Sequence, residues 1–99
     1  MATDYSRGEG KLYDSRSEKL LTSVSYQLYE ESTEVGNYQR WWGELTLTDY
    51  IRIPDGDRYF LELEDKRAGR CALRKRVNKA VSMVPARFFY FFQGTSPLK

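Results

Sequence analysis

Apolar and polar residues alternate along five stretches of the chain, and a period of two is typical of a half-buried β-strand. The stretches are 20–29, 40–49, 59–64, 70–77 and 86–93. A shorter sixth stretch holds Ile51 and Ile53 and stops at Pro54, since proline cannot donate to a strand ladder. No amphipathic helix longer than about one turn is visible. We therefore predict an all-β fold, a small antiparallel β-barrel or strongly bent sheet of about six strands.

The same alternation predicts which side chains form the core. One parity of each stretch is apolar, and its members are Leu20, Thr22, Val24, Tyr26, Leu28, Trp41, Leu45, Leu47, Tyr59, Leu61, Leu63, Cys71, Leu73 and Val77. Gly43 shares the inward parity of its strand, where it indicates a bulge or a sharp bend. Pro54–Asp57 is a turn, because proline presets φ and glycine accepts a positive φ.

The two ends of the chain lack this pattern. Residues 1–18 are polar, include Gly8 and Gly10 and show no apolar periodicity, so we expect a flexible N-terminal tail. Residues 19–94 form the expected single β domain. Residues 95–99 form a polar C-terminal tail.

Residue composition excludes most catalytic and metal chemistry. The 99 residues include no histidine and one cysteine, Cys71. Without histidine, neither the commonest general base nor a Ser–His or Cys–His pair is available, and structural zinc and iron–sulfur sites lose their ligands. No phosphate-binding loop or nucleophile elbow occurs. We expect no enzymatic activity, no cofactor and no bound metal.

Targeting signals are equally sparse. The longest apolar run, Phe88–Phe92, is far shorter than the ~20 residues of a membrane-spanning helix. The N-terminus shows no basic segment followed by an apolar one, and a lone thiol suits a reducing compartment. We expect a soluble cytoplasmic protein that does not enter a membrane.

Charge is distributed unevenly, although the net charge is only +2. Residues 1–65 contain all fourteen acidic residues and seven basic ones, whereas 66–99 contain nine basic residues and no acid. One interpretation is an anionic partner for the basic third. The other is neutralisation within the fold: a hairpin loop at 65–69, with Gly69 left-handed, would place Leu63 opposite Cys71 and Glu64 opposite Arg70. Glu62 would then lie between Arg70 and Arg74.

Aromatic residues supply the most distinctive feature. Alternation sends Phe88, Tyr90 and Phe92 to one face of the last strand, and Phe89 and Phe91 to the other. A strand that is apolar on both faces is usually covered on both. We therefore expect Phe89 and Phe91 to be covered within the chain or by a second subunit. The pair Trp41-Trp42 likewise sends one indole inward and one outward.

Together these patterns favour a non-catalytic binding or assembly module that acts through an aromatic and basic surface. A protein partner or a homodimer is the leading expectation. The alternative is a small barrel that binds single-stranded RNA or DNA by stacking and by arginine contacts. The residues expected on either surface are Trp42, Arg74, Arg76, Lys79, Arg87, Phe89 and Phe91.

Overall fold

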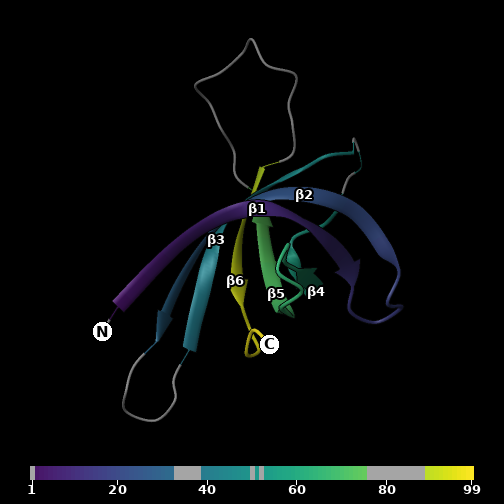
Figure 1. Cartoon of the computed structure of the whole chain (residues 1–99). Helices are drawn as coiled ribbons and strands as arrows, with labels where there is room; N and C mark the ends of the chain where they lie inside the picture. The colour runs from purple at the N-terminus through teal and green to yellow at the C-terminus, as the bar shows by residue number, and fades with distance from the viewer. Residues whose placement is uncertain (1, 33–38, 50, 52, 76–88) are drawn as a thin grey trace.

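The computed structural model describes residues 2–32, 39–49, 51, 53–75 and 89–99, and it confirms the all-β fold. Six antiparallel strands close into a barrel in the order β1-β2-β3-β6-β5-β4 (Figure 1). They are β1 (Ala2–Asp14), β2 (Leu20–Ser32), β3 (Gln39–Leu47), β4 (Gly56–Glu62), β5 (Ala68–Lys75) and β6 (Phe89–Gly94). The last strand therefore lies between β3 and β5, and β1 closes the barrel against β4.

Five of these strands were predicted from the alternation, and their inward faces form the core. In β2, for example, Val24, Tyr26 and Leu28 are buried between exposed polar neighbours. Leu20, at the start of the same strand, is the exception and is 53% exposed. The predicted short strand at Ile51 and Ile53 is wrong, because both residues lie outside the strands and pack against the core from a connection.

The prediction of a flexible tail at residues 1–18 is also wrong, because Ala2–Asp14 form β1 and pair with β2 from Ala2 to Tyr13. The inward positions of β1 include Gly8, Gly10 and Leu12, so two of its core-facing residues have no side chain. The Tyr26 ring takes their place: a Cβ on Gly8 would lie 2.8 Å from the Tyr26 hydroxyl oxygen. An aromatic ring over strand glycines is a known way to pin a register.

The hairpin between β4 and β5 has a different register from the predicted one. Tyr59, not Leu63, lies opposite Cys71, and Phe60, not Glu64, lies opposite Arg70. The loop is tighter than expected, because the Leu63 N–H donates to the Arg67 carbonyl at 2.7 Å. Lys66 takes the left-handed conformation with φ of 77°, while the predicted Gly69 is buried inside β5.

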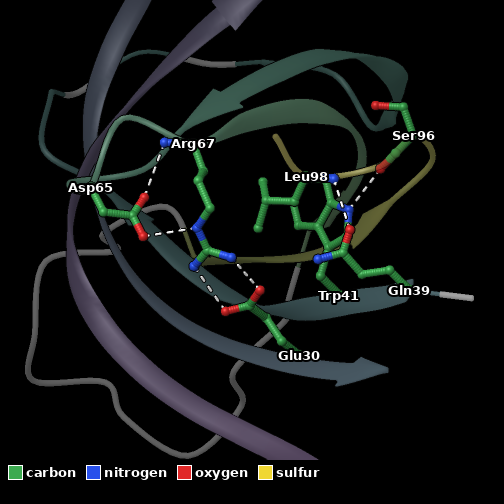
Figure 2. A network of polar contacts seen from close by, with 7 residues as sticks. All are labelled: Glu30, Gln39, Trp41, Asp65, Arg67, Ser96 and Leu98. Atoms are coloured by element: carbon green, nitrogen blue, oxygen red, sulfur yellow. Dashed lines mark hydrogen bonds and ion pairs between the residues drawn. The ribbon is translucent and has the colours of Figure 1, made fainter. Parts of the chain in front are cut away.

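Residues 95–99 are docked against one end of the barrel (Figure 2). The Trp41 Nε1–H donates to the Ser96 carbonyl at 2.8 Å, and the Leu98 side chain is 6% exposed. Lys99 and Ala68 exchange two backbone hydrogen bonds of 2.8 and 3.0 Å. The expected polar tail is thus a plug that completes the core beneath Trp41.

An arginine closes the same end of the barrel (Figure 2). The Arg67 guanidinium donates to both carboxylate oxygens of Glu30 at 2.5 and 2.9 Å, and its Nε–H donates to Asp65 at 2.8 Å. The hydrogen bond to Glu30 raises the pKa of Arg67. The Arg67 backbone N–H, followed by its side chain, lowers the pKa of Asp65. This network ties the hairpin loop to β2.

Candidate functional site

Three aromatic side chains form a row across the outer face of the barrel. Tyr5 of β1 pairs with Tyr29 of β2, which in turn pairs with Trp42 of β3. The ring centroids are 5.1 Å apart for Tyr5 and Tyr29, and 5.9 Å apart for Tyr29 and Trp42, whose planes are within 17° of parallel. These three residues are here called the aromatic row. Tyr29 and Trp42 point away from the core because their neighbours Leu28, Trp41 and Gly43 are buried, and Tyr5 shares their face through the strand pairing.

An arginine lies over the end of the aromatic row. The Arg40 guanidinium carbon is 5.3 Å from the centroid of the Trp42 ring, which is a cation–π distance. Arg40 is exposed and makes no ion pair with any described residue. On β6, Gln93 pairs with Trp42 and continues the row with a polar side chain.

A second group lies beside the row, on the outer face of β6 and β5. Phe91 is 43% exposed and pairs with Glu44 on one side and Arg74 on the other. Phe89 is half-buried opposite Thr46. The predicted outward direction of both phenylalanines is confirmed, since Tyr90 and Phe92 are buried.

The expected neutralisation of the arginines by Glu62 and Glu64 is contradicted by the register. Arg70 faces Phe60 and Arg74 faces Phe91, and neither arginine forms an ion pair within the described part of the chain. Both ion pairs found between described residues belong to Arg67 instead. Glu30 and Asp65 thus pair with Arg67 at one end of the barrel, and Arg70 and Arg74 lie exposed on its outer surface.

A groove of about 480 Å³ opens along the same outer face, over β1, β2, β3 and β6. Its lining includes Arg7 and Phe89 together with three carboxylates, Glu9, Glu44 and Glu64.

The thiol and one tyrosine of the core are held protonated, and the described residues form no cluster of metal ligands. The Cys71 thiol is fully buried, and burial raises its pKa to about 12, so it is held as the thiol. Burial likewise raises the pKa of Tyr59 to about 12, and its hydroxyl donates to the Pro54 carbonyl. Within the described ranges no three Asp, Glu or Cys side chains gather as a metal site, and no helix is long and apolar enough to cross a membrane.

Four of the seven surface residues expected from the sequence lie on this wall: Trp42, Phe89, Phe91 and Arg74. Arg76, Lys79 and Arg87 lie outside the described residues. Sequence reasoning missed Tyr5, Tyr29 and Arg40. Tyr29 and Arg40 were on the outward parity of predicted strands, but their adjacency depends on register. Tyr5 was missed because no strand was predicted in residues 1–18.

Compared with models of protein families, with curated protein sequences and with solved structures, the chain shows no match. The function proposed below therefore rests on the residues of the barrel's outer surface alone.

Proposed function

We propose that this protein is a non-catalytic protein-binding module, and that the partner docks on the outer face of β2, β3 and β6. The aromatic row with Arg40 above it carries the proposal. Tyrosine, tryptophan and arginine are the residue types that contribute most to binding at protein interfaces. Here Trp42 contacts both a tyrosine, Tyr29, and an arginine, Arg40.

The geometry supports this role in energetic terms. Tyr29 and Trp42 are already stacked, and Arg40 already lies over the indole, so little side-chain freedom is left to lose on docking. Ordering a flexible side chain at an interface otherwise costs about 0.5–1.5 kcal/mol. Phe91 adds an exposed apolar neighbour on the next strand.

Single-stranded nucleic acid is the second candidate, and one observation favours it. Arg74 projects beside Phe91 without a carboxylate partner among the described residues, which is the pairing of cation and ring that stacks and neutralises a nucleotide. It rests on one cation–ring pair, whereas the protein-binding proposal rests on Trp42 with two contacting side chains, Tyr29 and Arg40. We therefore place it second.

The test compares two single variants of the immobilised protein. Trp42→Ser removes the centre of the proposed surface. Phe60→Ser removes another exposed aromatic residue, 36% exposed on β4, and is the matched control. Proteins captured from nuclease-treated lysate are quantified, and the enriched protein is then purified and titrated directly against each variant.

The expected result is a direct complex that Trp42→Ser weakens by about 2 kcal/mol or more, while Phe60→Ser leaves it unchanged. Equal loss in both variants would contradict the placement of the surface. Capture that disappears with nuclease, together with direct oligonucleotide binding tighter than about 1 μM at ~150 mM salt, would promote nucleic acid to the first place.

A further inference from the structure

One edge of β1 is paired over only part of its length. Toward β2 the pairing runs from Ala2 to Tyr13, but toward β4 it covers only Lys11–Asp14. The segment Ala2–Gly8, here called the β1 overhang, thus presents one edge that pairs with no described strand. Figure 1 shows the N-terminal end of β1 projecting away from β4.

The β1 overhang is exposed on both of its faces. Thr3, Asp4, Tyr5, Ser6 and Arg7 are all exposed, and Tyr5 reaches 52%. Gly8 marks its inner limit, because the Glu64 side chain lies 3.3 Å from the position that a Cβ there would occupy. An open strand edge of this kind is a template for pairing with another strand.

We propose that the β1 overhang pairs antiparallel with the same segment of a second copy of this chain, in the register that places Tyr5 opposite Tyr5 of the copy. The pairing would merge two barrels through one continuous sheet. It uses backbone groups of β1, so it does not rest on the partner-binding role of Trp42 and Arg40.

The charges of the overhang select this register among the symmetric ones. Centring on Asp4 sets two aspartates opposite each other, and centring on Arg7 sets two arginines opposite each other, both of which are unfavourable. Centring on Ser6 extends the pairing to Gly10, where the Glu62 carbonyl already lies within 2.3 Å of a Cβ position. Centring on Tyr5 opposes Thr3 to Arg7 and Asp4 to Ser6, with no like charges in direct opposition.

The register also continues the aromatic row across the two-fold axis. The row ends at the overhang with Tyr5, whose ring is 5.1 Å from Tyr29 and whose other side has no described strand beside it. A second copy brings its own Tyr5 to that side. It also places its Arg7 diagonally across from Tyr5, within reach of a long side chain.

The experiment maps the register by disulfide formation between single-cysteine positions. Thr3→Cys and Arg7→Cys are purified separately, mixed and oxidised. Directly opposed residues of antiparallel strands have Cα atoms about 4.5–5.5 Å apart, which fits a disulfide. The native Cys71 is buried and does not interfere. Each variant oxidised alone is the control, because identical positions four residues from register lie about 13 Å apart.

We expect a disulfide-linked dimer from the mixture and little from either variant alone. Sedimentation of the unmodified protein at about 100 μM should show a reversible dimer. Thr3→Lys, which opposes Arg7 of the copy, should raise its dissociation constant about tenfold. Ser25→Lys, on exposed β2 surface opposite Glu9, should not.

A monomer at that concentration without cross-linking in the mixture would overturn the proposal. So would equal cross-linking in all three samples, since this indicates random collision. Loss of the dimer on Ser25→Lys as well as Thr3→Lys would assign the effect to net charge and also overturn it. None of these results bears on whether Trp42→Ser weakens a different partner.

Discussion

The single cysteine shows how burial fixes the chemistry of one residue. Cys71 has no exposed surface, and its pKa is raised from 9.0 to about 12 because burial disfavours the thiolate. We expect native protein to react with a thiol reagent at pH 8 only as fast as it unfolds. Labelling measured by mass should become complete within minutes in denaturant. Rapid labelling of native protein would contradict the burial.

Cys71, together with Tyr59, also makes the free energy of unfolding depend on pH in alkaline solution. The pKa values of Cys71 and Tyr59 are both about 12 in the fold and return on unfolding to about 9 and 10. Above pH 9 the unfolded state therefore holds fewer protons than the native state. The free energy of unfolding should fall as pH rises, by up to about 1.4 kcal/mol per unit for each ionising group.

Urea unfolding at a series of pH values from 7 to 10.5 measures this slope. Cys71→Ala should lower stability at every pH but flatten the decline between pH 9 and 10, where the thiol is the more ionised of the two groups in the unfolded chain. A decline of unchanged steepness in that variant would assign the alkaline loss to other groups.

At the scale of elements, β1 is the strand that the alternation of apolar and polar residues did not predict. Five strands were predictable because most of their inward positions hold an apolar or aromatic side chain. In β1 the inward positions near the core are Gly8, Gly10 and Leu12, and the bulk that fills the space above the glycines belongs to Tyr26. A pattern within one segment cannot record a side chain that another strand supplies.

The registers were harder to predict than the strands for a related reason. Two residues of loop length decide which outward side chains meet, and Lys66 rather than Gly69 takes the positive φ. The predicted pairing of Glu64 with Arg70 is wrong because the loop is shorter than predicted. The aromatic row was not predictable either, because Tyr5, Tyr29 and Trp42 come together only through two strand registers.

The contribution of β1 to stability can be measured at Leu12, whose side chain is fully buried. Leu12→Ala should reduce the free energy of unfolding by about 2–5 kcal/mol, because it removes buried methyl groups and leaves a cavity. Leu20→Ala is the matched control, since Leu20 is 53% exposed, and it should change stability by less than about 0.5 kcal/mol. Equal effects would mean that β1 does not belong to the cooperative unit.

At the scale of the whole molecule, the barrel depends on the plug formed by residues 95–99. Deleting Pro97–Lys99 removes the buried Leu98 side chain and the two backbone bonds to Ala68. We expect a loss of several kcal/mol and wetting of Trp41. In a Trp42→Phe background the Trp41 emission should shift to longer wavelength in the folded truncated protein.

Pro97→Ala keeps the plug and is the control for that deletion. Its emission and stability should stay close to those of the parent. An unshifted Trp41 spectrum in the truncated protein would show that the indole is shielded without residues 97–99.

The position of β6 in the strand order has a consequence for biosynthesis. β6 pairs with β3 on one side and β5 on the other, yet it follows both in the chain. A chain emerging from the ribosome can assemble β1 to β5. The edges of β3 and β5 that pair with β6 nevertheless stay unpaired until residue 94 has left the exit tunnel. At about 5–20 residues per second this interval lasts seconds, which is long enough for neighbouring nascent chains on one messenger to pair wrongly. Codon changes that slow translation after residue 75 should lower the soluble yield, whereas slowing within β1, when no strand has yet emerged, should not.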